Sequence, residues 1–360
     1  MKALSCNSFV GWLELPIYCI VPKLERKIMI KVYHYDTSHC SRKVRLVLAE
    51  LDIPHKLITV HITMCQNYAP DYVRLNPGMV VPTLVEMDGT VVLDSKVIIE
   101  YVVKNYTEKY NRADLRPKGI EAEKTAAYWL GQMDTLDVET ISFRSGNYLP
   151  VFIADLRQKK ALRLMSMYIA RFSEKDPKLA ELYRIRQKKV VAAFNRIASK
   201  EGVKAALGRL LSDLKKMDSH LADGRAWLCG DQFTLADVGW APVFRRLDDI
   251  KYTQMVLEGL PNVQRYVKAV KARPAYKKAI NGFPPPTASM PHKLRVVGNL
   301  AYDRFFGGKE AILFGVIVAV AAFGWFYVKK REPADRADEM SLLDLKQSIT
   351  SRPANRNFTK

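Results

Sequence analysis

The stretch from Asn76 to Tyr101 constrains the fold more than any other part of the chain. It contains Pro82, which cannot donate a hydrogen bond to a neighbouring strand, so the apolar residues after it predict a strand that begins at the proline. Asp88-Gly89 follows between residues of high β propensity, and this pair is typical of a hairpin turn. The stretch therefore predicts two antiparallel strands in a hairpin.

A helix that can bind a ligand at its start is predicted directly after the hairpin. Apolar residues recur at helical spacing behind Asp94-Ser95, so Ser95 is expected to be the N-cap of this helix. The free N–H groups of such a helix start can hold the carboxylate of a small zwitterion, while Asp94 holds its amine. Asp94 and Ser95 are therefore candidate binding residues.

A second candidate site lies in the turn around Ser38. Residues 29–35 alternate like a half-buried strand, and a helix is expected from Ser41. In the polar turn between them, the Ser38 hydroxyl can hydrogen-bond a thiolate, and Cys40 can form a mixed disulfide. The alternative is that Ser38 and Ser41 only cap the helix while Cys40 packs beneath it. His39 is expected at the solvent and has no assigned role.

The order of these elements resembles a known family. Residues 56–62 predict another strand and residues 69–75 a short helix, which gives the order β-α-β-α-β-β-α. Val-Pro before the third strand and Asp-Ser before the third helix resemble the glutathione site of the glutathione transferase superfamily. The resemblance implies an α/β thioredoxin-like domain over residues 29–107, a cis Val81–Pro82 bond, and glutathione held by Val81, Pro82, Asp94 and Ser95.

The turn carries a finer resemblance. Ser38-x-Cys40 is similar to the Ser-x-Cys pattern of the zeta class of this superfamily. By that match, Ser38 is the hydroxyl that activates the thiol of glutathione, and Cys40 is its redox neighbour. Both are the predicted catalytic residues.

Residues 118–282 are expected to form the all-α C-terminal domain of the family, after a polar linker. Within it, Thr234 and Asp237 predict a capping box, which is a structural role. Residues 141–198 form a long basic helical insertion, whose charged faces are expected to be solvated surface. The apolar stripe over residues 203–221 is expected to face the core or a second subunit.

The insertion narrows the resemblance to one branch of the superfamily. Residues 174–189, 207–221 and 227–230 are similar to the branch of ganglioside-induced differentiation-associated protein 1. That likeness implies a cytosol-facing protein of the mitochondrial outer membrane, linked to mitochondrial fission and network shape, with peroxisomes as a second location. It also implies a homodimer and partners among mitochondrial-dynamics proteins. The Asp94-Ser95 pair is intact here, whereas this branch often lacks it.

The end of the chain predicts attachment to a lipid bilayer. Ala311 to Val328 contains no charged residue and would span roughly 27 Å as a helix, so it is expected to be a transmembrane tail anchor. A Pro-containing linker and an amphipathic segment precede it over residues 283–310, and a polar tail follows over residues 329–360. The amphipathic segment is expected either on a membrane or docked on the domain. Residues 1–28 form an extension of unassigned role, and Met29 is an alternative start.

Composition limits the classes of ligand. The net charge of +20 suits an anionic membrane surface or anionic ligands, and because no nucleic-acid motif accompanies it, no nucleic-acid partner is expected. The five cysteines and six histidines lack metal-ligand spacing, which predicts a reducing compartment and no metal site.

Two functions follow from the sequence. The first is a tail-anchored transferase that binds glutathione and conjugates it to electrophiles. The second is a non-catalytic membrane-anchored adaptor or redox sensor that uses the same fold to recruit partners. The sequence identifies neither the electrophile nor the protein partners.

Overall fold

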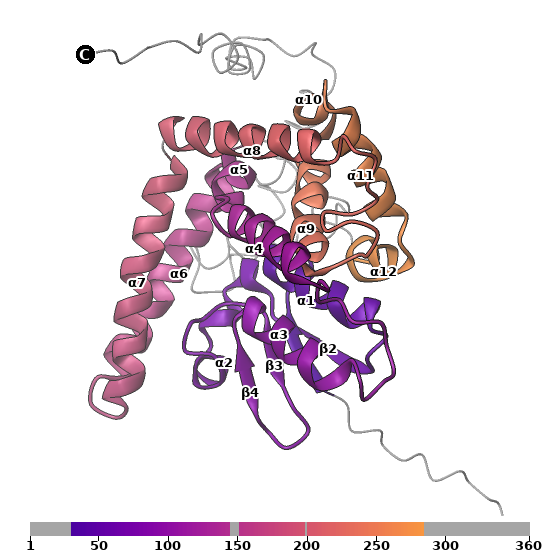
Figure 1. Ribbon diagram of the computed structural model, residues 1–360. Coiled ribbons are helices and arrows are strands. Elements are labelled where there is room, and N and C mark those ends of the chain that lie inside the picture. Colours follow the sequence, from indigo (N-terminus) through magenta and orange to yellow (C-terminus); the bar gives the residue numbers. More distant parts are fainter. Residues whose placement is uncertain (1–29, 145–150, 199, 284–360) are drawn as a thin grey trace, which may run out of the picture.

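The computed structural model describes residues 30–144, 151–198 and 200–283. A sheet domain is followed by a larger helical domain that packs against it (Figure 1). The predicted extension 1–28, the amphipathic segment, the transmembrane span Ala311 to Val328 and the polar tail lie outside the described residues. Among the helices that are described, none is both long and apolar enough to cross a membrane.

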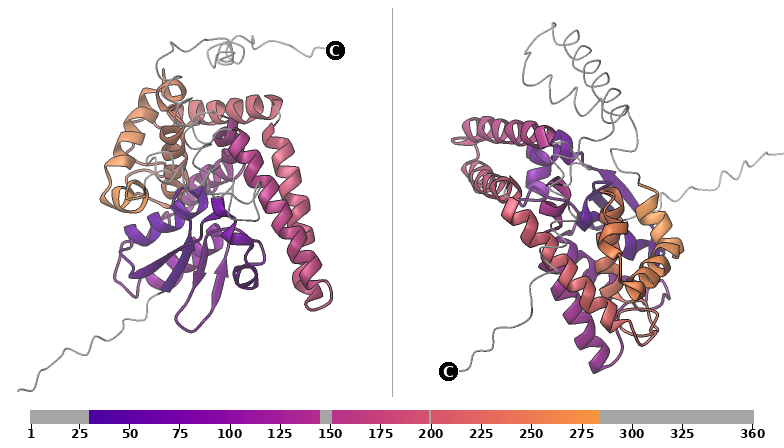
Figure 2. Two further views of the ribbon diagram at one scale, coloured as in Figure 1. Left: turned by 180° about the vertical axis from the view of Figure 1, so that it is seen from behind. Right: turned by 90° about the horizontal axis from the view of Figure 1, so that it is seen from above.

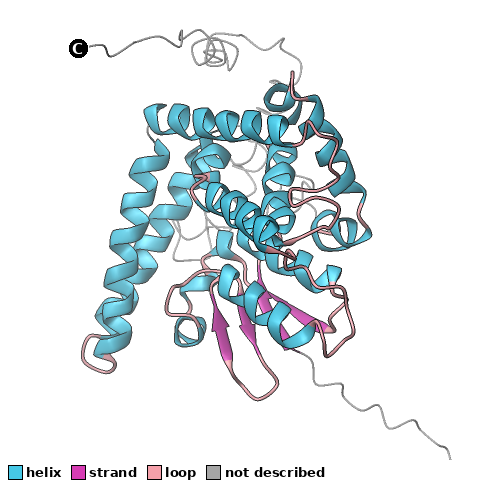
Figure 3. Ribbon diagram, in the orientation of Figure 1, coloured by secondary structure: helices cyan, strands magenta, loops and turns pink. Residues whose placement is uncertain are grey.

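The sheet domain has the predicted β-α-β-α-β-β-α order. Its four strands lie in the order β2-β1-β3-β4, with β2 parallel to β1 and with β3 antiparallel to both β1 and β4. The strands are β1 Ile30–His34, β2 His55–Thr59, β3 Thr83–Val85 and β4 Val91–Leu93. The helices are α1 His39–Glu50, α2 Pro70–Leu75 and α3 Ser95–Tyr106, and two 3₁₀ turns, η1 Ile62–Met64 and η2 Gln66–Tyr68, follow β2. Figure 3 distinguishes the strands from the helices by colour.

The alternation in β1 distributes these helices over the two faces of the sheet. Ile30 and Val32 are buried in the large core that also contains the apolar faces of α1 and α3. Tyr33 and Tyr35 point to the opposite face, where the Tyr33 ring lies 6.0 Å from that of Tyr72 in α2. The period of two in the sequence therefore places α1 and α3 on one side and α2 on the other.

The β3–β4 hairpin confirms the predicted pair of strands. Its turn runs from Glu86 to Gly89, and the Gly89 N–H donates to the Glu86 carbonyl over 3.2 Å. Gly89 has φ +91°, a conformation that glycine adopts without a Cβ clash. A two-residue Asp-Gly loop of type I′ needs a positive φ at both residues, but here Gly89 has a positive φ and Asp88 does not. The turn therefore spans more residues than a two-residue loop.

The helical domain surrounds one buried helix, α9. The Trp240 indole N–H in α9 donates to the Trp129 carbonyl of α4 over 2.9 Å. The predicted stripe of residues 203–221 lies in α8, and its Leu210, Leu214 and Met217 are fully buried, so this stripe faces the core. The helices are α4 Ile120–Asp134, α5 Val138–Arg144, α6 Val151–Phe172, α7 Pro177–Ala198, α8 Lys200–His220, α9 Leu235–Asp249, α10 Thr253–Leu257, α11 Pro261–Ala272 and α12 Pro274–Tyr276, followed by the π-helical turn η3 Lys277–Asn281.

The predicted capping box begins α9. The Asp237 carboxylate accepts from the Thr234 N–H over 2.8 Å. It also accepts from the Leu228 N–H over 3.0 Å and from the Tyr266 hydroxyl over 2.8 Å. These hydrogen bonds satisfy a fully buried carboxylate, so the role of Asp237 is structural, as expected.

The insertion forms a hairpin of α6 and α7 that runs down the side of the sheet domain (Figures 1 and 2). Its tip meets α2, where Arg74 and Asp176 form an ion pair of 3.3 Å. Higher up, the Tyr183 hydroxyl donates to the Tyr68 carbonyl of η2 over 2.8 Å. An apolar side of the hairpin is thus packed on η2 and α2, a contact that the expectation of solvated basic faces did not include.

Candidate functional site

The three predicted site segments meet at one end of the sheet. Tyr33 of β1 pairs with Thr83 of β3, and Thr83 pairs with Leu93 of β4. The turn after β1, the Val81-Pro82 pair before β3 and the Asp94-Ser95 pair after β4 therefore project from the same edge. Strand register, rather than sequence proximity, brings these residues together.

Ser38 occupies the start of α1. It is the N-cap, and its Oγ accepts from the Ser41 N–H over 3.3 Å. Ser38 therefore caps the helix, whereas Ser41 does not, because its buried Oγ accepts from the Tyr35 N–H over 3.3 Å. A hydroxyl that accepts one hydrogen bond can still donate its own proton. Ser38 is half-buried, so capping the helix and donating to a thiolate are compatible.

Cys40 is the second residue of α1 and is a half-buried free thiol. It is therefore not packed fully beneath the helix, as the alternative required. The first turn of a helix carries a partial positive charge, which favours a thiolate near it. Ser38 and Cys40 thus both lie at the end of α1 that can stabilise negative charge on sulfur.

The Val81–Pro82 bond is cis, as the resemblance implied. Within the described part of the chain, neither the N–H nor the C=O of Val81 makes a hydrogen bond, although the residue is only 7% exposed. Buried backbone groups of this kind are usually paired. An extended peptide can supply both partners at Val81, in the manner of an added strand.

Side chains from α2 and η2 fix the loop before Pro82. The Asn76 side-chain amide and the Tyr72 hydroxyl both donate to the Val80 carbonyl, over 2.9 and 2.6 Å. The Asn67 amide donates to the carbonyl of Met79 over 2.8 Å, and Met79 has φ +53°. The sequence showed Asn76 only as a helix stop, and it gave no signal for Asn67.

Asp94, not Ser95, is the N-cap of α3. Its Oδ1 accepts from the Lys96 N–H over 2.7 Å, and its φ of +69° lies outside the helical region. The prediction that Ser95 caps the helix is therefore wrong, because the carboxylate one residue earlier is placed to take that N–H. Ser95 is the first helical residue and is buried, while Asp94 is exposed. The pair still presents a carboxylate and a helix N-terminus side by side.

A group of basic side chains lies beside the turn. Lys43 of α1 is buried, with its Nζ 4.0 Å from the Met133 Sδ of α4. Arg246 of α9 is buried and donates to the Thr37 carbonyl over 2.7 Å. These cations add to the positive potential at the start of α1. The sequence did not indicate that these residues are buried, because lysine and arginine side chains are usually exposed.

His39 differs from its expectation. Both of its ring nitrogens are inaccessible to solvent and have no hydrogen-bond partner in the described chain. Burial lowers the pKa of His39 well below its ordinary value, and the charges of Lys43, Arg246 and Arg42 lower it further. His39 is therefore only partly exposed rather than at the solvent, and its ring nitrogens are buried where α9 packs against α1.

Arg45 connects the turn to the end of the helical domain. Its guanidinium donates to the carbonyls of Asp36 and Ala279, each over 2.9 Å, and it also hydrogen-bonds the His34 Nδ1 over 3.0 Å. Its planar fork can hold several fixed acceptors at once. The turn that carries Ser38 is therefore held from both domains. Among the described residues, no group of acidic, histidine and cysteine side chains could hold a metal ion.

Models of two protein families match the sequence of this chain. The family described as "Glutathione S-transferase, N-terminal domain" matches residues 32–110, and "Glutathione S-transferase, C-terminal domain" matches residues 191–269. The first match contains every predicted glutathione-binding residue. The α6–α7 hairpin falls mostly between the two matches, which agrees with its being an insertion in the second domain.

Similar curated proteins extend over most of the chain. The tetrachloro-p-hydroquinone reductive dehalogenase of Sphingobium chlorophenolicum is 28% identical over 262 residues, which cover 69% of this chain and 95% of that protein. Ganglioside-induced differentiation-associated protein 1-like 1 of Homo sapiens is 25% identical over 321 residues, which cover 83% of this chain and 86% of that protein. The similarity to the second protein includes the hairpin.

Two solved structures share the fold. The β-etherase of Sphingobium sp. strain SYK-6 superposes with a TM-score of 0.54 at 18% identity, covering 71% of this chain and 99% of that one. The glutathione transferase F7 of Populus trichocarpa gives a TM-score of 0.50 at 18% identity, with 71% and 99% covered. At this identity the likeness concerns architecture alone.

Proposed function

The chain belongs to the glutathione transferase superfamily, and on that premise we propose that it binds glutathione and conjugates it to an electrophile. In this proposal, the Val81 backbone pairs with the peptide of glutathione next to Pro82. Asp94 and the start of α3 hold its charged γ-glutamyl end. The observation that carries the proposal is the convergence of these groups with Ser38 at one sheet edge.

In the reaction, Ser38 acts on the sulfur of glutathione. The thiol loses its proton to solvent, and the Ser38 O–H donates a hydrogen bond to the thiolate that remains. The thiolate then attacks the electrophilic carbon, forming an S–C bond, and the leaving group departs with its electron pair. The cations beside the turn and the start of α1 favour the thiolate over the neutral thiol.

Cys40 supports a second reaction of the same site. Its thiolate can attack glutathione disulfide, forming a mixed disulfide with one glutathione and releasing the other as thiolate. Glutathione disulfide is itself the oxidant of Cys40, so the exchange needs no other oxidant. Half-burial of Cys40 at the helix start is the observation that favours this candidate. A Cys40→Ser variant that keeps transferase activity and loses exchange would separate the two reactions.

The decisive experiment is a calorimetric titration of the protein with glutathione. The double variant Asp94→Ala, Ser95→Ala should bind at least about tenfold more weakly, because it loses a charge-assisted contact. Asp94→Asn keeps a capping oxygen but removes the charge, so it separates binding from loss of the cap. Glutathione affinity that is the same in all three proteins would overturn the proposal.

We propose, further, that the chain is a tail-anchored protein of the mitochondrial outer membrane, with its domains in the cytosol and peroxisomes as a second location. Support comes from the uncharged run Ala311 to Val328 with its basic flank, and from the likeness to ganglioside-induced differentiation-associated protein 1-like 1. Deleting residues 311–360 should release the protein from carbonate-washed mitochondrial membranes. Retention of the shortened chain on those membranes would contradict the anchor.

The same branch likeness supports a role in mitochondrial fission and network organisation, together with a homodimer. In the alternative function, the fold is a membrane-anchored adaptor or redox sensor, and the docked α6–α7 hairpin is the feature that favours it. Network morphology in cells that carry either the hairpin deletion or the Asp94→Ala, Ser95→Ala variant distinguishes the two functions. A defect with the hairpin deletion alone supports the adaptor, and a defect with the site variant supports the enzyme.

A further inference from the structure

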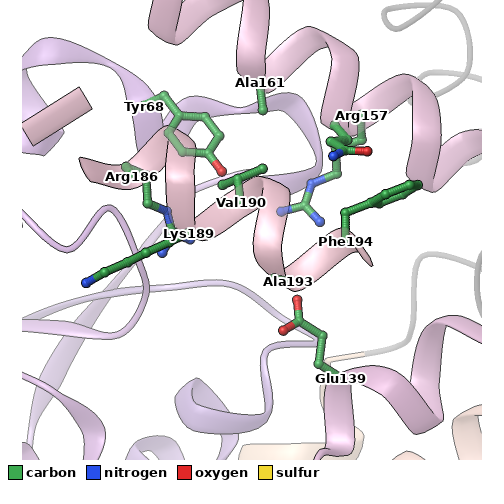
Figure 4. Close-up of a pocket in the computed structure, with 10 residues that line it drawn as sticks. Tyr68, Glu139, Arg157, Ala161, Arg186, Lys189, Val190, Ala193 and Phe194 are labelled. Carbon is green, nitrogen blue, oxygen red and sulfur yellow. The ribbon is translucent and has the colours of Figure 1, made fainter. Parts of the chain in front are cut away.

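A cavity of about 160 Å³ lies where the α6–α7 hairpin meets η2 and α5 (Figure 4). Its walls come from Tyr68 of η2, Glu139 of α5, and residues of α6 and α7. None of these residues belongs to the proposed glutathione site. The function proposed above therefore leaves this cavity without a role.

Arg157 provides the central charge of the cavity. Its Nε donates to the Ile62 carbonyl over 3.1 Å, which fixes the guanidinium plane. Figure 4 shows the guanidinium directed into the space between the Tyr68 ring and Phe194. Within the described chain, its two terminal nitrogens have neither a hydrogen bond nor an acidic partner. Those nitrogens form a fork of donors that matches an oxyanion.

Arg186 and Lys189 of α7 add two more positive charges to the lining. The Arg186 Nε is inaccessible to solvent and has no hydrogen-bond partner in the part of the chain that is described, although buried donors are usually satisfied. Lys189 contributes to the lining, but its chain is directed away from the Arg157 guanidinium (Figure 4). Glu139 is the one acidic residue of the lining, so the lining contains three basic residues and one acidic residue. The cavity is thus electropositive.

The remaining walls set the size and nature of an occupant. Ala161, Val190 and Phe194 contribute apolar surface, and Tyr68 directs its hydroxyl inward. An apolar cavity of roughly 150 Å³ accommodates one benzene ring. Bare phosphate would leave these apolar walls uncovered. A ligand with an anionic head and a small apolar body uses both halves of the lining.

We propose that this cavity binds a small organic anion, with a carboxylate or phosphate-ester head on Arg157 and Arg186 and a body of about one ring against Val190 and Phe194. The guanidinium forks bind the head, and the Tyr68 hydroxyl completes its hydrogen bonds. The binding is non-covalent and uses no residue of the proposed glutathione site.

Thermal unfolding and calorimetry of the full chain test the site, with benzoate, phenyl phosphate and the neutral benzamide as probes. At least one anion should raise the melting temperature and bind about tenfold more tightly than benzamide, since a charge-assisted hydrogen bond is lost in the neutral probe. Binding should persist in saturating glutathione, because no residue of the proposed glutathione site lines the cavity. Whichever of the two anions binds more tightly identifies the head group as carboxylate or phosphate ester.

Arg186→Met is the sharper variant, because it keeps the hydrogen bond of Arg157 to the Ile62 carbonyl. It should weaken anion binding about tenfold, whereas the matched control Lys188→Met, on the same helix but outside the cavity, should not. Equal binding of benzamide and the anions, equal binding by Arg186→Met and Lys188→Met, or no binding of either anion would each overturn the proposal.

Discussion

Arg42 of α1 and Asp249 of α9 form an ion pair of 2.6 Å in which both side chains are almost completely buried, 0% and 1% exposed. Asp249 also accepts from Arg245 over 2.8 Å. The pair joins the helix that carries Ser38 and Cys40 to the central helix of the second domain. The two domains are thus connected directly behind the candidate site.

Arg42→Met should lower the free energy of unfolding by about 3 kcal/mol, because it leaves a buried carboxylate with only one cation. Urea unfolding at neutral pH measures this loss. Arg245→Met removes the more exposed of the two partners and should cost less than Arg42→Met. Equal stability of Arg42→Met and the parent protein would show that the pair does not hold the domains together.

Ser38→Ala and Ser38→Asp separate the two roles of this residue. Alanine removes both the cap and the hydroxyl donor, whereas aspartate keeps a capping oxygen and removes the donor. Both variants should slow conjugation about 100-fold, since each lacks the hydrogen bond to the thiolate. Only Ser38→Ala should also lose about 1 kcal/mol of stability.

Thiolate absorbance of bound glutathione, followed against pH, checks this prediction. The thiolate should form at a higher pH in both Ser38 variants than in the parent protein. If the thiolate forms at the same pH in Ser38→Asp as in the parent protein, Ser38 is a cap alone and Cys40 carries the chemistry of the turn.

Stability should fall on acidification because of His34. Burial, aided by the charge of Arg45, lowers the pKa of His34 to about 3. Below about pH 6.5 the unfolded chain therefore binds a proton that the folded chain does not. The stabilising effect of neutral His34 is complete above about pH 6.5 and is lost progressively as the pH falls toward 3. Burial lowers the pKa of His55 and His39 in the same direction.

His34→Asn keeps an acceptor for Arg45 and removes the titration. Between about pH 6 and pH 4.5, its unfolding free energy should depend on pH less steeply, by about 1.4 kcal/mol per pH unit. Urea unfolding of both proteins across this range provides the comparison. Parallel stability curves for His34→Asn and the parent protein would contradict a neutral, buried His34.

Asp237→Asn should destabilise the helical domain without changing the site. The Thr234 and Leu228 N–H groups now donate to different oxygens of the carboxylate. The amide keeps only one of these oxygens, so its NH2 group would direct a donor at one of the two backbone N–H groups. The expected loss is about 2–4 kcal/mol of unfolding free energy. Calorimetry should show unchanged glutathione affinity for the folded fraction. A change in affinity with unchanged stability would make Asp237 a site residue instead.

Local patterns predicted the elements whose causes lie close together in sequence. The strand before Asp88-Gly89, the Thr234–Asp237 box and the helix stop after Leu75 each depend on neighbours within a few residues. The wrong N-cap at Ser95 is also a local error, because Asp94 and Ser95 are both good caps and only the backbone angle at Asp94 decides between them.

The features that the sequence did not predict depend on contacts between segments that are distant in the chain. From the local sequence, Lys43 and His39 are expected at the surface. They are covered by α4 and α9, and the sequence around the turn does not indicate which helices pack there. Docking of the hairpin on Tyr68 depends likewise on an apolar face that its many charges obscure. The convergence of the site follows from strand register, for which the family resemblance was a better guide than residue spacing.

The contact between Tyr183 and Tyr68 connects the hairpin to the loop that precedes Pro82. Asn67, next to Tyr68, holds the Met79 carbonyl at the loop that precedes Pro82. Under the function proposed above, a partner that draws the hairpin away from η2 removes a support of this loop and so weakens glutathione binding. Thermodynamic reciprocity then requires glutathione to oppose that partner by the same free energy. Cellular thiol concentration would in this way become an input to any assembly that captures the hairpin.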